Sequence, residues 1–196
     1  MRLPKTEYTS RPWRIHEFAQ DFKLEDLWRL PTPGGPDDLK LLVRQFATVD
    51  DQPDRQLSPA TRALFAVRWQ IGRVMGWDKP DTGVNKRVPS LRDRLPADLL
   101  EGPRGPDLPT KPFTSVYQTD TEWVSELANS TVHALMHIGW VSDDAGGYHA
   151  QMGVLVKTNG VLGKAYMAAI LPLRYTIVYP SLIRTIGRGW EQRKKE

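Results

Sequence analysis

The sequence contains no cysteine, which excludes disulfide bonds, thiolate nucleophiles and cysteine-based zinc sites. It also has no glycine-rich dinucleotide fingerprint, no phosphate-cradling loop and no serine nucleophile elbow. The N-terminus lacks the apolar core of a signal peptide. The longest uncharged apolar runs, 165–173 and 175–183, are separated by Arg174 and are too short to span a bilayer. These absences predict a soluble cytoplasmic protein with no membrane insertion and no cofactor.

Composition and charge are those of an ordinary globular domain with an excess of tryptophan. The 196 residues carry a net charge of +4 and are 40% hydrophobic, which suffices for one domain with a sizeable core. Basic residues gather only in the tail, where a helix C-terminus attracts cations, so we expect no nucleic-acid partner. The sequence contains seven Trp, six Tyr and five Phe. Such aromatic side chains fill a core or line a pocket for an apolar ligand.

The first half of the chain predicts two strands and two helices after an extended lead-in. A short strand is expected at 13–18, and a second at 22–30, where Phe22 and Leu24 alternate although Leu24, Leu27 and Trp28 also fit a helical turn. A helix is predicted at 37–48, because acidic residues at its start are followed by apolar residues at helical spacing. Ser58-Pro59 is a typical helix start, and Gly76 suits the end of that second helix.

Prolines punctuate residues 78–112, a segment that is too long for a plain connector. One short helix, near 90–95, interrupts it. Two interpretations stay open for this excursion. It is a packed surface segment, or it is a lid over a pocket.

The second half of the chain predicts an antiparallel sheet. Strands are expected at 113–119, from Trp123 to Leu127, at 131–141 and at 148–158. Alternation places one set of residues of the last two strands on one face and a second set on the other. The first set is Val132, Ala134, Met136, Ile138, Trp140, Tyr148, Ala150, Met152, Val154 and Val156, and the second contains His133, His137 and His149.

A long C-terminal helix follows, from Asn159 to Trp190, with apolar residues at steps of three or four. Pro172 lies inside this pattern and predicts a kink, because proline removes a backbone donor and clashes one turn back. Helices on one face of an antiparallel sheet make an α+β fold, and we expect a single domain over residues 1–196.

This element order resembles the START-like (SRPBCC) helix-grip fold, in which a curved antiparallel sheet grips a long C-terminal helix. At residue level the chain resembles an uncharacterised domain-of-unknown-function family, also found fused behind short NAD-binding reductase-like domains. Most of the resemblance lies in Asn159-Gly-Val-Leu-Gly-Lys-Ala-Tyr-Met-Ala-Ala-Ile-Leu-Pro172. Further matches are Asn129–His133, Trp140-Val141, Gln151–Lys157, Ile177–Pro180 and Leu91–Leu95.

The resemblance implies a cavity between sheet and helix that holds a hydrophobic or amphipathic small molecule. Relatives in the wider superfamily bind lipids, sterols, plant metabolites and polyketides, and some catalyse cyclisation or hydration. The family itself has no assigned reaction. Because the chain lacks a dinucleotide fingerprint and a preceding strand–helix unit, we expect a stand-alone domain without NAD.

His133, His137 and Tyr117 are the candidate catalytic residues, since histidine acts as an acid or base near neutral pH. Possible partners are Tyr117, Gln118, Tyr148, Arg68 and Asp26, which the sequence cannot place. A three-histidine zinc site with His149 is the alternative. Neither His-x-His spacing nor a nearby acid supports it, so we expect no metal and place the histidines on a polar or partly covered face.

Three hypotheses follow for function. The first is binding of a hydrophobic or amphipathic small molecule, with Trp28, Tyr117, Met136, Trp140, Tyr148, Met152 and Tyr166 as lining. The second is an enzyme of secondary metabolism, such as a cyclase or dehydratase, that uses the same cavity. The third is an interaction module that forms a homodimer through a sheet edge.

Overall fold

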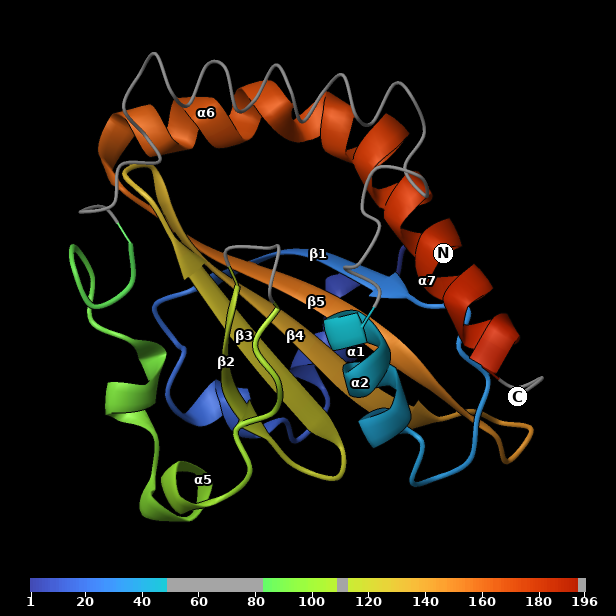
Figure 1. Cartoon of the computed structure of the whole chain (residues 1–196). Coiled ribbons are helices and arrows are strands. Elements are labelled where there is room, and N and C mark those ends of the chain that lie inside the picture. Colours follow the sequence, from blue (N-terminus) through green and yellow to red (C-terminus); the bar gives the residue numbers. More distant parts are fainter. Residues whose placement is uncertain (49–82, 109–112, 194–196) are drawn as a thin grey trace.

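The computed structural model describes residues 1–48, 83–108 and 113–193, without the side chains of Leu162 and Tyr166. Its centre is a five-stranded antiparallel sheet with the strand order β1-β5-β4-β3-β2 (Figure 1). Helices pack on this sheet, so the predicted α+β class is confirmed, and the arrangement is consistent with a helix-grip fold. The strands are β1 (Lys23–Arg29), β2 (Thr114–Gln118), β3 (Glu122–Ala128), β4 (Val132–Ser142) and β5 (Tyr148–Thr158).

The helical segments confirm most of the predicted elements. The helix predicted at 37–48 and the short helix near 90–95 are present, whereas the helix predicted from Ser58 to Gly76 lies outside the described residues. The predicted strand at 13–18 is wrong, because this stretch crosses over the sheet as a 3-10 turn. The helical segments are α1 (Lys5–Thr9), η1 (Arg14–Glu17), α2 (Leu39–Thr48), η4 (Leu91–Arg94), α5 (Ala97–Glu101), α6 (Gly160–Leu173), η5 (Arg174–Val178) and α7 (Tyr179–Arg193).

Both faces of the sheet are covered. The helix face carries Met136, Ile138 and Met152, which pack in one cluster with residues of α2 and α7. The N-terminal face carries Leu135 and Leu155, which pack with the first residues of the chain and with η4 and α5. The β4–β5 register pairs Met136 with Val154 and His137 with Gly153, as the predicted alternation requires.

A β-bulge in β1 decides which side chains of this edge strand face the long helix. Leu24 pairs with Leu155 but Asp26 pairs with Val154, so Glu25 is an extra residue. Without the bulge Asp26 would lie opposite Gly153, on the N-terminal face. The extra residue therefore turns Asp26, and with it Trp28, to the helix face.

The C-terminal helix changes direction next to its proline, as predicted. Pro172 lies near the end of α6, and the next residues, Arg174–Val178, form a π-helical turn before α7 begins. The Thr176 hydroxyl donates to the Pro172 carbonyl at 2.9 Å. Figure 1 shows α6 crossing above the sheet and α7 descending along its side. The helix therefore forms an arch rather than a rod.

Glycines anchor this arch close to the sheet at both ends. A Cβ on Gly163 would lie 2.2 Å from the Thr131 carbonyl oxygen, and a Cβ on Gly187 would lie 2.6 Å from Pro31 Cγ. Such contacts are possible only without a side chain. The start of α6 and the middle of α7 are thus held against the sheet side of the molecule, and the stretch between them spans the helix face.

We expect Gly163→Ala to destabilise the fold by about 1–3 kcal/mol, because the new methyl group meets a backbone carbonyl that cannot rotate away. Helix propensity alone predicts the opposite sign, a gain of about 1 kcal/mol. Urea unfolding followed by circular dichroism measures the difference. Gly83→Ala is the matched control, because a Cβ there meets nothing within 4 Å. A Gly163→Ala protein as stable as the wild type would contradict the close contact.

Both edges of the sheet are partly occupied by the chain itself. Along β1, Leu3 N donates to Leu27 O and Arg29 N donates to Met1 O. Along β2, Gln118 N donates to Pro103 O and Arg104 Nε donates to Ser115 O. A homodimer through a sheet edge therefore finds no support here. The described part of the proline-rich excursion, 83–108, is held against the sheet, and the remainder of 78–112 lies outside the described residues.

Candidate functional site

A buried polar cluster joins β1 to the π-helical turn on the helix face. Asp26 is completely buried and accepts three hydrogen bonds. Arg174 Nη2 donates to its Oδ2 at 2.6 Å and the Tyr179 hydroxyl donates to the same oxygen at 2.8 Å. The Tyr175 hydroxyl donates to Oδ1, and Arg174 Nη2 also donates to the Tyr179 hydroxyl. The carboxylate thus holds the bend of the helix against the sheet.

The local sequence explains why these three donors converge. The backbone N–H of Tyr179 donates to the carbonyl of Arg174, five residues earlier, which is the hydrogen bond of a π-helix, and Tyr175 follows Arg174 directly. π-turns are rare and occur frequently at functional sites. Trp28 completes the cluster, since its ring lies 4.9 Å from that of Tyr179 and 6.2 Å from that of Tyr175.

The electrostatics of the cluster keep both phenols neutral. Burial raises the pKa of Tyr179, and burial together with the hydrogen bond to Asp26 raises the pKa of Tyr175. Burial disfavours the charged form of Arg174, but the contacts of Arg174 with Tyr179 and Asp26 outweigh this effect of burial and raise its pKa. At neutral pH the site therefore contains one ion pair and two phenol donors.

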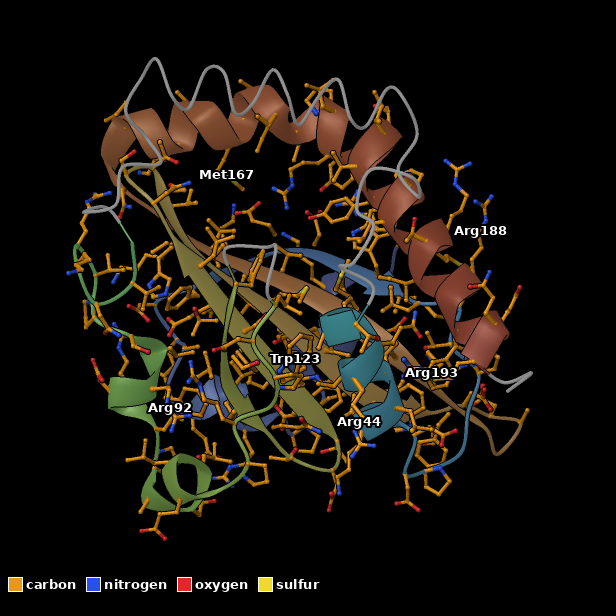
Figure 2. All side chains as sticks on the ribbon, in the orientation of Figure 1. Arg44, Arg92, Trp123, Met167, Arg188 and Arg193 are labelled. Carbon is orange, nitrogen blue, oxygen red and sulfur yellow. The ribbon has the colours of Figure 1, made fainter. Side chains whose placement is uncertain are left out.

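Small and flexible apolar side chains lie under α6, beside this cluster. Val132, Ala134 and Val156 of the sheet form a separate group, against which Met167 of α6 packs. Figure 2 shows Met167 on the side of α6 that faces the sheet. Val154, on the inner strand β5, stays partly exposed although it faces the helix. Val154 and Met167 are therefore only partly buried between the sheet and α6.

The predicted lining residues fall into four groups. Trp28 and Met136, each 9% exposed, belong to the core cluster on the helix face; Trp28 contacts Tyr179 of the polar cluster, and Met136 lies opposite Val154. Trp140, Tyr148 and Met152 share this face but pack in the core with α2 and α7, where Trp140 lies 6.0 Å from Trp190. Tyr117 lies on the opposite face, away from the long helix. The side chain of Tyr166 is outside the described part of the structure.

The candidate catalytic residues lie on the N-terminal face, in two separate hydrogen-bond networks. Glu122 Oε2 accepts from the Tyr117 hydroxyl at 2.9 Å and lies 3.1 Å from His137 Nε2. Glu126 forms a second network: its Oε2 lies 2.8 Å from His133 Nε2, and its Oε1 accepts from the Ser90 hydroxyl. Sequence reasoning thus paired Tyr117 with a histidine but missed the two carboxylates that join the groups.

A signal for these carboxylates was available. The alternation of β3 places Glu122 and Glu126 on one face, four residues apart. His133 and His137 have the same spacing on the neighbouring strand. Two acids and two histidines at equal spacing on adjacent antiparallel strands predict two hydrogen-bonded carboxylate–histidine pairs.

The N-terminal segment covers this face more completely than predicted. Tyr8 and Trp13 contact the ring of His137, with centroids 5.2 Å and 5.1 Å away, and Phe22 contacts His133 at 4.9 Å. His137 is only 1% exposed, so no substrate reaches it in this structure. We expected this face of the sheet to be polar or partly covered. It forms a second core instead, because these aromatic rings exclude water from it.

The three histidines do not form a common site. His149 lies opposite Val141 whereas His133 lies opposite Lys157, so they occupy different ends of the β4–β5 pair. Eight residues of strand separate these positions, or roughly 27 Å. Among the described residues, no group of three His, Asp or Glu side chains is arranged to hold a metal ion.

The buried networks predict how stability depends on pH. Burial lowers the pKa of His137 below its usual 6.5. Below that pH, His137 therefore binds a proton more readily in the unfolded chain than in the folded protein. The free energy of unfolding should therefore fall as the pH drops below about 6.5. Burial disfavours the charged form of Glu122, but hydrogen bonds from His137, Arg14 and Tyr117 outweigh this effect and lower its pKa. The free energy of unfolding should therefore fall further as the pH drops below about 4.5.

Urea unfolding at pH 8, 6.5 and 5.5 measures this dependence. His137→Gln should reduce the fall between pH 6.5 and 5.5, and His149, whose pKa burial also lowers, keeps part of it. A variant with the same pH profile as the wild type would contradict the assignment to His137.

None of the described helices is long and apolar enough to cross a membrane. In comparisons with known proteins, the model of a family described as "Protein of unknown function (DUF2867)" matches residues 18–181. No curated protein and no solved structure matches the chain.

Proposed function

This chain belongs to the DUF2867 family, and we propose that it binds a hydrophobic or amphipathic small molecule between its sheet and α6. The apolar part of the molecule contacts the helix face beneath α6. Its polar end lies at the Asp26 cluster. The order of elements also supports our proposal that the family is related to the START-like (SRPBCC) proteins.

One observation carries the proposal: the helix is anchored at its ends and at its bend, but is loosely packed between them. Gly163 holds one end and the Asp26–Arg174 pair holds the bend. Between these anchors, Val154 and Met167 remain partly exposed although they face the inside of the arch. Binding sites for small molecules typically combine such an apolar wall with a few convergent polar groups.

A neutral apolar dye, N-phenyl-1-naphthylamine, tests the proposal through its fluorescence. We expect the wild-type protein to bind it with a Kd of roughly 1–10 μM, a common range for an apolar ligand of this size. Ala134→Phe fills space beneath α6 and should weaken binding at least tenfold. Ala145→Phe is the matched control, because Ala145 is exposed in the hairpin loop between β4 and β5.

The absence of binding by the wild type would overturn the proposal. Equal binding by a folded Ala134→Phe protein would also contradict it. If circular dichroism shows that Ala134→Phe does not fold, Val154→Phe takes its place. Native mass spectrometry of the gently purified wild type gives an independent readout, because an endogenous ligand adds a discrete mass.

An enzyme that uses the same space is the second candidate, and one observation favours it. Tyr175 is partly exposed and its hydroxyl donates to the buried carboxylate of Asp26, an arrangement suited to proton transfer. A cyclase or dehydratase needs such an acid–base pair beside its substrate. The ligand that co-purifies with Tyr175→Phe should then be an unreacted precursor of that in the wild type. Identical ligands in both proteins would contradict this role.

A further inference from the structure

We infer that the polar end of the ligand is a carboxylate, bound by Arg174 Nη1 and Trp28 Nε1; this inference rests on the function proposed above. Both nitrogens are buried, and neither meets an acceptor among the described residues. A buried donor without a partner costs about 1–3 kcal/mol, and a charged one costs more, so such groups are normally satisfied. Two of them in one cluster indicate an acceptor that comes from outside the chain.

The side chains that carry the two donors both contact one aromatic ring, that of Tyr179. The guanidinium carbon of Arg174 is 5.3 Å from the centroid of the Tyr179 ring, and the Trp28 ring is 4.9 Å from it. Asp26 is the acceptor for neither nitrogen: its two oxygens accept from Arg174 Nη2, Tyr175 and Tyr179. The side chain of Arg174 is 11% exposed, so few waters can compete for its free nitrogen.

The charge balance selects an anion. Asp26 neutralises Arg174, which leaves the guanidinium of Arg2 stacked over Tyr175 at 4.5 Å from the ring centroid. No acid pairs with Arg2 in the described part of the chain. The Asp26–Arg174 pair, together with the exposed Arg2 at the edge of the cluster, therefore sums to one positive charge. A carboxylate supplies one negative charge and oxygens for two or three N–H donors, whereas a phosphate would leave most of its acceptor sites unmet.

The ligand class is thus an apolar carboxylic acid. Its hydrocarbon or aromatic part extends from the Asp26 cluster along the helix face towards Ala134 and Met167. Chain length and ring content depend on the volume beneath α6, but the head group depends only on the residues named above.

Isothermal titration calorimetry with dodecanoate and 1-dodecanol tests the head group, since both ligands carry the same chain. We expect the wild type to bind dodecanoate at least tenfold more tightly than 1-dodecanol. Trp28→Phe removes the indole donor and Arg174→Lys removes Nη1 while it keeps the charge beside Asp26. Each should lower the affinity for dodecanoate at least threefold more than the affinity for 1-dodecanol, because only the carboxylate loses a charge-assisted hydrogen bond.

Trp190→Phe is the matched control, because the Trp190 indole already donates to Pro33 O at 2.9 Å, and it should keep the full preference. Equal binding of both ligands by the wild type would overturn the carboxylate assignment but leave the proposed function intact. Failure of both to bind would count against the proposed function itself. A preference that survives in Trp28→Phe and Arg174→Lys would place the carboxylate elsewhere and overturn the inference.

Discussion

Asp26→Asn should lower the free energy of unfolding by about 3–5 kcal/mol, the largest effect that we expect from a single polar substitution. The change keeps the size of the side chain but removes its charge. Arg174 would then be a buried cation without a counter-ion, and two phenols would lose a charged acceptor. Urea unfolding at pH 7.5 measures the loss.

The matched control is Asp21→Asn. Asp21 also pairs with two cations, Arg94 and Lys157, both at 2.7 Å, but its side chain is 38% exposed. Solvent screens such pairs, so the control should lose no more than about 1 kcal/mol. The double variant Asp26→Asn/Arg174→Gln should recover part of the loss, since no buried charge remains. Equal, small losses for Asp26→Asn and Asp21→Asn would contradict a buried ion pair at the helix bend.

Glu122→Gln should cost about 3 kcal/mol, because it disrupts the centre of the buried network on the N-terminal face. Glu122 is 2% exposed and accepts from Tyr117, His137 and the backbone N–H of Arg14. The glutamine side chain has only one acceptor oxygen, so its amide nitrogen, itself a donor, would face donors that now bind a carboxylate oxygen. The same urea experiment measures the loss.

Glu17→Gln is the control for this prediction, because Glu17 pairs with Arg14 at the surface and is 54% exposed. It should change the stability by less than about 1 kcal/mol. The N-terminal segment provides a second readout, since Arg14 N is bound to Glu122 Oε1 at 2.8 Å. Amide hydrogen exchange of residues 8–17 should become faster in Glu122→Gln. Unchanged exchange would show that this network does not hold the segment.

Strand alternation predicted the sheet well, because β4 and β5 are long, regular inner strands. The register Met136–Val154 and His137–Gly153 follows directly from a period of two. The same rule left β1 ambiguous, since Leu24 and Leu27 are three residues apart yet share a face. The bulge at Glu25 explains this spacing, and it depends on the pairing with β5, which periodicity within one strand does not reveal.

The candidate site was only partly predictable for a different reason. Asp26 was among the conceivable polar partners, but Arg174, Tyr175 and Tyr179 lie about 150 residues further along the chain. Pro172 predicted the bend, whereas the π-turn that directs these side chains to Asp26 depends on the contact with the sheet. The burial of His133 and His137 was missed because the N-terminal lead-in has no strong periodicity and gave no sign that it would cover a sheet face.

The most direct test of ligand binding beneath α6 is methyl NMR with ¹³C-methyl methionine and N-phenyl-1-naphthylamine. The methyl group of Met167 belongs to the roof of the proposed site and that of Met136, which lies opposite Val154 in the sheet, to its floor. Met1 is 72% exposed at the N-terminus. We expect NOEs from the dye to the methyl groups of Met167 and Met136, with upfield ring-current shifts, and none to that of Met1. Dye bound to the protein with no NOE to Met167 or Met136 would contradict a binding site between the sheet and the helix.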